Sequence, residues 1–287
     1  MPLHRINGHY HIQHSQPDGD SIHFHPNDPT AFTTLHLAAQ VHADGGVQLR
    51  LEAIDALETH YSPRVHGGFL HHQPPGLAHA AAQQLLDLLG FTEVVRDGET
   101  VTDSTPARTG GFILTRFADK YGRPVAFAYA GQADQPDLSL VRVDEDLLAA
   151  SVNYQLAAQG LVYPTYYSKL YPDLRNALTA AVEQARSAKT GIWDADATTT
   201  GAELTSLAAL DERLVIMPKL FRRLVDYLAL GAGSISLAGF GAFLATRDDR
   251  LFVVSEGHAT GFDNIVEVSG QTVRLSHPPE DLIFIEA

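Results

Sequence analysis

Three short polar segments of the sequence carry the side-chain types that phosphodiester hydrolysis uses. Asp20 and Asp55 are short carboxylates at the ends of expected strands, and such oxygens suit a hard divalent cation. Glu58 is one methylene longer and lies just past its strand, where it can orient or deprotonate a water molecule. The three segments are 18–21 (DGDS), 50–59 (RLEAIDALET) and 119–123 (DKYGR).

Two arginines in these segments complete the set. Arg50 and Arg123 each provide a planar guanidinium that can form paired hydrogen bonds with the oxygens of a phosphoryl group. Metal ligands, a base and two arginines are together the groups that phosphodiester hydrolysis requires. Each segment alone is more often structural. Arg123, for example, can pair with Asp119 across its turn in an exposed contact worth about 0–1 kcal/mol.

The first two-thirds of the chain has the alternation and turn chemistry of short strands. This pattern predicts an α+β fold: a five-stranded barrel of OB type with packed helices, followed by a small C-terminal domain of helices and strands. Helices are expected over 77–89, 151–160 and 173–189. Strands are expected within 9–24, around a turn at 17–20, and over 34–41, 47–54, 112–117 and 125–130.

A small, polar stretch at 194–201 indicates a linker between two domains. The predicted division is a barrel domain over 1–196, a linker over 197–202 and a C-terminal domain over 203–287. The stretch 203–230 is helical in pattern, and Pro218 within it should start a new helix or kink the old one. C-terminal strands are expected over 240–246, 251–255, 265–268, 272–276 and 282–285.

Composition limits the classes of function. The 287 residues carry a formal net charge of −14, which counts against general affinity for nucleic acid but not against an enzyme that grips one phosphate. The chain has no cysteine, which excludes disulfides, thiolate metal sites and a cysteine nucleophile. No segment has the length and apolarity of a membrane span, and no signal segment follows Met1. We therefore expect a cytoplasmic protein, or a secreted one if a signal preceded Met1.

The histidines are concentrated near the N-terminus, where two pairs fall on expected strands. His9 and His11 share one strand face, as do His23 and His25, and two such pairs can hold a transition metal. Their spacing matches no standard metal motif, and exposed polar surface is the more common role of such residues. Both interpretations stay open.

The three polar segments resemble those of the staphylococcal nuclease (thermonuclease) family, over about residues 9–196. Segment 119–123 is similar to the family's D-K-Y-G-R, 50–58 has its R-x-x-x-x-D-x-x-E spacing, and 18–21 is similar to its D-G-D-T. The family's D-T-P-E turn reads Asp55-Ala56-Leu57-Glu58 here. The resemblance implies an OB-type barrel with a calcium-dependent site that cuts DNA and RNA and leaves 3′-phosphates.

The resemblance also implies a role for each matching residue. Asp20 and Asp55 would bind calcium, or another divalent cation, together with the backbone carbonyl of Ala56. Glu58 would be the general base. The two arginines that would stabilise the pentacoordinate phosphorus are Arg50 and Arg123, and the residues that would contact a terminal nucleotide are Lys120, Tyr121 and Tyr166.

These observations leave three hypotheses. The leading one is a metal-dependent nuclease acting on single-stranded or frayed DNA or RNA, with a C-terminal domain that supports homo-oligomerisation or binds a protein partner. The second is a nuclease-like barrel that binds nucleic acid or protein without cutting. The five charged positions named above favour the enzyme. In the third, the C-terminal region carries the main function and the barrel is accessory.

Overall fold

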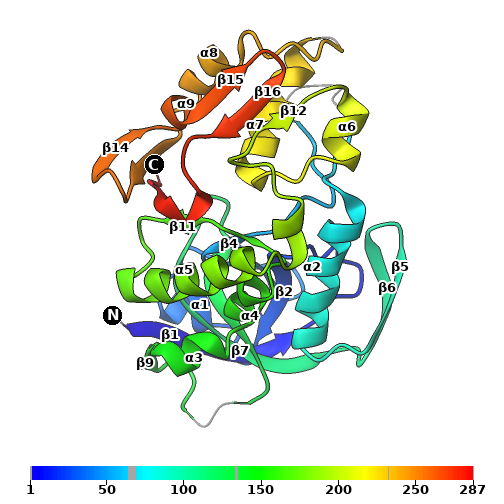
Figure 1. Cartoon of the computed structure of the whole chain (residues 1–287). Helices are drawn as coiled ribbons and strands as arrows, with labels where there is room; N and C mark the ends of the chain where they lie inside the picture. The colour runs from blue at the N-terminus through cyan, green and yellow to red at the C-terminus, as the bar shows by residue number, and fades with distance from the viewer. Residues whose placement is uncertain (1, 64–68, 133–134, 232, 287) are drawn as a thin grey trace.

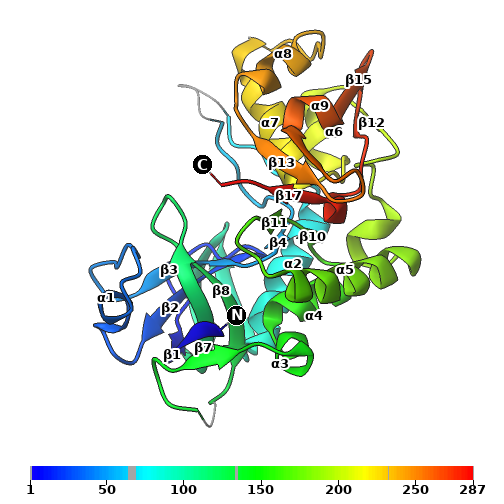
Figure 2. The same ribbon diagram turned by 90° about the vertical axis from the view of Figure 1, so that its left-hand side faces the viewer.

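The computed structural model of the chain describes residues 2–63, 69–132, 135–231 and 233–286. The fold is α+β, and five of its strands close into a barrel in the order β1, β2, β3, β8, β7 and back to β1 (Figure 2). The predicted five-stranded barrel is therefore confirmed. Its strands are β1 (Pro2–Tyr10), β2 (Ser21–Pro26), β3 (Val47–Leu51), β7 (Thr109–Ala118) and β8 (Pro124–Ala130).

The pairing register brings the three polar segments to one end of the barrel. Strands β2 and β3 are antiparallel, with Ser21 opposite Arg50, and β3 runs parallel to β8, with Arg50 opposite Val125. Asp20 directly precedes β2, and Arg123 directly precedes β8. Segments that are far apart in the sequence therefore converge near the end of β3.

The three predicted helices form and cover the barrel. Their buried faces follow the helical period, as with Ala78, Ala81 and Leu85 in α2, and pack against the buried barrel residues. None of the described helices is long and apolar enough to cross a membrane. The helices are α2 (Pro75–Leu88), α4 (Val152–Ala158) and α5 (Pro172–Ser187).

The strand predicted over 34–41 does not form. A one-turn helix, α1 (Ala31–Thr34), occupies the start of this stretch, and no strand follows it up to Val41. Strand β2 pairs directly with β3, with Phe24 opposite Val47, so the ring has no place for a strand between them. Leu35 and Leu37 instead pack onto the core from an irregular segment. The apolar side chains at 35 and 37 therefore contribute to the core without forming a strand.

Several short elements of this region were not predicted. The largest is a hairpin that projects from the barrel, and the smallest are two-residue strands that border the candidate site (Figure 1). They are β4 (Ile54–Asp55), β5 (Glu93–Asp97), β6 (Thr100–Thr105), β9 (Leu140–Arg142), α3 (Glu145–Ala149), β10 (Tyr163–Pro164), β11 (Tyr166–Tyr167) and η1 (Gly191–Asp194).

The C-terminal region mixes helices and strands, as predicted. Pro218 is the first residue of α7, where a missing N–H and a fixed φ suit a helix start. Its other elements are β12 (Ala202–Glu203), α6 (Leu207–Glu212), η2 (Ala229–Gly231), α8 (Phe240–Ala245), β13 (Arg250–Val253), β14 (His258–Gly261), α9 (Phe262–Ile265), β15 (Val266–Ser269), β16 (Thr272–Leu275), η3 (Pro279–Asp281) and β17 (Leu282–Phe284), beside α7 (Pro218–Leu228).

The prediction of a strand over 240–246 is wrong, because this stretch is helix α8. Phe240, Phe243 and Leu244 have the i, i+3, i+4 spacing of a helix face, and all three are buried. The ring of Tyr227 on α7 lies 5.4 Å from the rings of both phenylalanines. This short apolar run fits both the two-residue period of a strand and the 3.6-residue period of a helix. Packing against α7 selects the helix.

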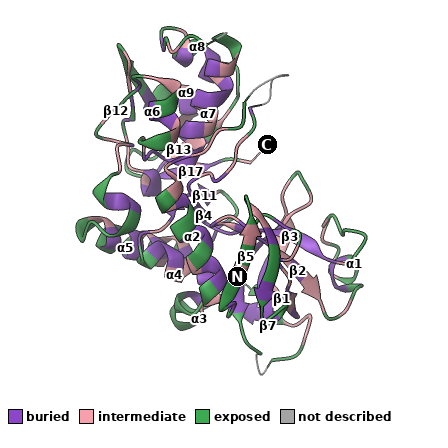
Figure 3. Cartoon of the chain, turned by 90° about the vertical axis from the view of Figure 1, so that its right-hand side faces the viewer, coloured by how far each residue is buried: buried purple, intermediate pink, exposed green. Residues whose placement is uncertain are grey.

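The C-terminal region is joined to the barrel region by pairing and by a shared core. Strand β17 pairs in parallel with β11, which belongs to the barrel part of the sequence (Figure 2). Buried apolar residues run without a break from one region into the other (Figure 3). Within the stretch predicted to be a linker, Thr198 is buried, and its hydroxyl accepts a hydrogen bond of 2.9 Å from the Met217 amide.

Candidate functional site

The carboxyl groups of Asp20 and Asp55 meet at the end of the barrel, as expected for two ligands of one cation. Burial, followed by the charges of Asp18 and Asp55, raises the pKa of Asp20 well above its ordinary value. The side chains of Asp20 and Asp55 lie within hydrogen-bonding reach of each other. The Ala56 amide donates to Asp20 at 2.9 Å, which places the Ala56 backbone beside the pair. Hard oxygen donors that meet in this way suit calcium.

A left-handed corner after β3 places Asp55. Ala53 has φ of 71°, and the chain there leaves the barrel to form β4, in which Asp55 pairs with Tyr163 of β10. The buried side chain of Asn153 holds this corner: its amide donates to the carbonyls of Glu52 (2.9 Å) and Ala126 (3.1 Å). The corner is therefore tied to strand β8 through a buried side chain.

Gly19 allows the loop that carries Asp20 to lie against this corner. A Cβ atom at position 19 would lie 2.6 Å from the Cβ of Ala56 and 2.7 Å from that of Ala81 in α2. Only glycine fits so close an approach. Gly19 is thus required for this packing.

Glu58 lies in the loop after β4 and is largely buried. Burial raises its pKa to about 7, against the lowering effect of the Arg222 guanidinium. A carboxylate with a pKa near 7 is well suited to act as a general base at neutral pH. Gln73 fixes the loop, since its side chain accepts from the Glu58 amide (3.2 Å) and donates to the carbonyl of Ile216 (2.8 Å). The C-terminal region therefore helps to place Glu58.

Arg50 extends from the outer face of the barrel toward the acidic residues, and a tyrosine lies against it. Its guanidinium carbon is 4.5 Å from the centre of the Tyr167 ring. Tyr167 and the carboxylates of Asp55 and Asp20 keep the pKa of Arg50 above its ordinary value in spite of burial. The predicted Tyr166 does not reach this group: it is wholly buried, and its hydroxyl lies 3.0 Å from that of Thr179 in α5.

Arg123 lies at the same end of the barrel but pairs with its own turn. Its guanidinium is 2.8 Å from the Asp119 carboxylate, which also accepts the Arg123 amide at 3.0 Å. About a third of the Arg123 side chain is exposed. Lys120 and Tyr121 are exposed at the tip of this turn, so their side chains are accessible to a ligand in solution.

A third arginine, which the sequence did not indicate, enters the site from the C-terminal region. Arg222 of α7 makes two hydrogen bonds to Asp55, at 2.7 and 3.1 Å, and a further one to Glu58. Burial would lower the pKa of Arg222, but the two carboxylates raise it well above its ordinary value. No local pattern links positions 55 and 222, so only the fold reveals this contact.

The N-terminal histidines gather on the outer face of β1 and β2. The rings of His9 and His25 are stacked with centres 5.1 Å apart, and His11 meets His25 edge-on at 5.7 Å. Across the residues that the structure describes, no group of three or more histidine, aspartate or glutamate side chains is arranged to hold a metal ion. A cation bound by Asp20 and Asp55 would take its other ligands from backbone carbonyls and water.

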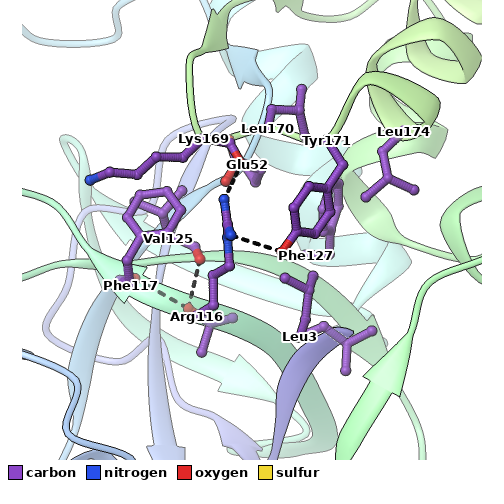
Figure 4. A pocket seen from close by; sticks show the side chains of 12 residues that line it. Leu3, Glu52, Arg116, Phe117, Val125, Phe127, Lys169, Leu170, Tyr171 and Leu174 are labelled. Carbon is purple, nitrogen blue, oxygen red and sulfur yellow. Dashed lines mark hydrogen bonds between the residues drawn. The ribbon is translucent and has the colours of Figure 1, made fainter. Parts of the chain in front are cut away.

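A small pocket beside β7 and α5 contains none of the residues predicted for the site (Figure 4). Its volume of about 10 Å³ holds a water molecule at most. Arg116 crosses it and donates to the Tyr171 hydroxyl at 2.8 Å. Glu52 also lines the pocket, and burial raises its pKa to about 7. We assign this pocket a structural role.

Glu52 gives a prediction about stability. Its pKa is higher in the folded chain than its ordinary 4.5, so the stability of the wild type falls as the pH rises from about 4.5 through 7. Glu52→Gln removes this titration. We expect the variant to gain about 2–3 kcal/mol in unfolding free energy above pH 7 and little at pH 4.5. Urea unfolding at both pH values measures this gain in unfolding free energy. The control is Glu145→Gln, which changes an exposed residue. An equal difference at both pH values would contradict the prediction.

No protein-family model and no curated protein matches this chain. The assignment of a function therefore depends on the geometry of the site.

Proposed function

We propose that the chain is a calcium-dependent phosphodiesterase that hydrolyses DNA or RNA, favours single-stranded substrate and leaves 3′-phosphate ends. The observation that carries the proposal is the convergence of Asp20 and Asp55 beside Glu58 and Arg50. Four side chains from two separate segments, 18–21 and 50–59, meet at one end of the barrel, and each has the chemistry that its proposed role needs. A carboxyl group with a pKa near 7 beside two converging carboxyl groups is a combination that active sites favour.

The roles of the residues follow from their chemistry. Asp20 and Asp55 would hold the divalent cation, which supplies charge to the phosphate oxygens when bound. Glu58 would accept a proton from the attacking water, and Arg50 would direct its guanidinium toward the oxygens that gain charge. Tyr167 holds the Arg50 guanidinium by its ring face. Arg123 would have to leave Asp119 to reach the same phosphate.

We further propose that the barrel is of OB type and related to the staphylococcal nuclease family. The closed ring of β1, β2, β3, β8 and β7 supports this, because β1–β2–β3 form a meander and β3 pairs in parallel with a later strand. The matching segments 18–21, 50–58 and 119–123 all fall at the same end of the ring. A search for substrate should therefore begin with nucleic acids.

A second candidate function is a module that binds nucleic acid without cutting it. The contact of Arg222 with Asp55 and Glu58 favours it, since a guanidinium already neutralises the two carboxylates. Incubation with single-stranded DNA and RNA, in calcium or in EDTA, separates the two functions. The enzyme shortens the substrate in calcium only and leaves 3′-phosphates. Retention on the substrate with no shortening at any calcium concentration would indicate the binding module.

Calcium binding gives a prediction for Asp20. We expect Asp20→Asn to weaken calcium binding about tenfold or more, because the cation loses one of its two carboxylate ligands. Titration calorimetry on the folded variant measures the affinity. The control is Asp173→Asn, an exposed aspartate at the start of α5, which should bind as the wild type does. Equal affinity in Asp20→Asn and wild type would place the metal site elsewhere.

A further inference from the structure

Helix α7 directs two neighbouring arginines in different directions. Adjacent residues of a helix point about 100° apart. Arg223 bonds to Asp249 of its own region at 2.6 and 2.9 Å, and Lys219 joins the same carboxylate at 3.1 Å. Arg222 alone reaches across to the barrel region, where it bonds to Asp55. Only one of the two arginines therefore acts on the candidate site.

The segment before α7 and the helix itself are held firmly over the site. The hydroxyl of Tyr61 donates to Asp226 of α7 at 3.0 Å, and His71 is 3.0 Å from Asp211 of α6. The buried Gln73 connects the Ile216 carbonyl to the backbone of Glu58. Arg222 thus projects from a fixed support, and its contact with the carboxylates is built into the arrangement of the two regions.

The guanidinium of Arg222 lies among the carboxylate oxygens of Asp55 and Glu58, where a bound cation would also lie. Both oxygens of Asp55 accept from it, and one oxygen of Glu58 does as well. The Asp55 side chain is only 6% exposed, so these oxygens have little other access to solvent. A divalent cation that uses Asp55 as a ligand would need an oxygen that Arg222 now occupies.

We infer that Arg222 is an internal competitor for the metal site: its guanidinium and the divalent cation bind the same carboxylate oxygens, so the cation must displace it. The inference rests on the metal site of the proposed function. It makes the C-terminal region the element that sets how much calcium the barrel needs. A ligand that moved α7 away from Asp55 and Glu58 would lower that requirement.

An alternative role for Arg222 is to bind the substrate phosphate as a third arginine. The contacts oppose this, because three of its five N–H donors already bond to the two acids. The two roles predict different effects of removing Arg222 on calcium affinity and on cleavage. A competitor, once removed, raises calcium affinity and raises cleavage at low calcium, whereas a phosphate-binding arginine, once removed, lowers cleavage and leaves calcium affinity unchanged.

The test is calcium titration calorimetry on the full chain with Arg222→Gln, beside Arg223→Gln as the matched control. Both variants remove one partly buried arginine from α7, but only the first frees Asp55 and Glu58. We expect Arg222→Gln to bind calcium about tenfold or more tightly than wild type, and Arg223→Gln to bind within twofold of it. In the double variant Asp20→Asn/Arg222→Gln the gain should be largely lost, which would locate the effect at the acidic residues.

Unchanged calcium affinity in Arg222→Gln, on a protein that unfolds at the same temperature as wild type, would overturn the inference. If Arg222→Gln does not fold, Arg222→Lys is used instead, because lysine keeps the positive charge but cannot make the paired hydrogen bonds of a guanidinium. We expect a smaller gain in calcium affinity from Arg222→Lys. No gain in that variant would also overturn the inference. Cleavage is measured in parallel. Tighter calcium binding without cleavage would reject the proposed nuclease and keep the inference, whereas normal cleavage with unchanged affinity would do the reverse.

Discussion

Arg50→Lys is expected to lower the rate of phosphodiester cleavage by about 10²–10³-fold while the chain still folds and binds calcium. A lysine ammonium is a point charge and cannot form two parallel hydrogen bonds to phosphate oxygens. It also loses the flat contact that Arg50 makes with Tyr167. Single-turnover cleavage of single-stranded DNA at saturating calcium measures the effect on the chemical step.

The control for this variant is Arg142→Lys, which changes an exposed arginine of β9. The control protein should cleave at the wild-type rate. Near-normal cleavage by Arg50→Lys would remove the main reason to regard the barrel as this class of enzyme. Arg123→Lys belongs in the same experiment. A comparable loss would mean that Arg123 leaves Asp119 to act on the phosphate. Normal cleavage would mean that its ion pair with Asp119 only stabilises the turn.

Glu58→Gln is expected to lower cleavage by about 10²–10⁴-fold, the range found when a positioned general base is removed. Glutamine keeps the shape of the side chain and the contact with Arg222 through its carbonyl oxygen, but it cannot accept the proton from water. The measurement is the cleavage rate across pH 5–9. Wild-type cleavage should rise with pH up to the pKa of Glu58 in the calcium complex and then level off.

Two further measurements complete the Glu58 experiment. The control is Glu145→Gln, which changes an exposed residue of α3 and should leave the pH profile as it is in the wild type. Calcium affinity is measured on both variants, so that a loss of metal is not mistaken for the loss of a base. A Glu58→Gln protein that binds calcium and cleaves at the wild-type rate would assign the base to another residue.

Local patterns were enough to predict the barrel and most of its elements. Residues 112–117 and 125–130 are short apolar and aromatic runs, a local pattern typical of buried strands. The turn residues between them and the 3.6-residue period of α2 and α5 are equally local signals. The Asp-Gly-Asp and Arg-to-Glu segments were found because polar side chains at strand ends stand out against apolar neighbours. These features depend on residues that are close in the sequence.

Short apolar runs were predicted less well. Residues 34–41 and 240–246 both contain apolar positions that a strand can use, yet the first is mostly irregular and the second is helix α8. The first has no strand partner, because β2 already pairs with β3. The second is fixed by contacts of Phe240 and Phe243 with the ring of Tyr227 on α7. In both cases the deciding contact lies elsewhere in the chain, so the local pattern could not distinguish a strand from the structure that forms.

The sequence by itself determined four of the five barrel strands, the helices that cover the barrel, and the carboxylates and arginines of the proposed site; strand β1 (Pro2–Tyr10) overlaps the expected strand region only at residues 9 and 10. Tertiary structure alone decided which of these side chains meet. It brought Tyr167 instead of Tyr166 to Arg50, paired Arg123 with Asp119, and placed Arg222 on Asp55 and Glu58. Ion pairs between residues more than 160 positions apart depend on how two regions pack, and packing leaves no periodic signal in the chain.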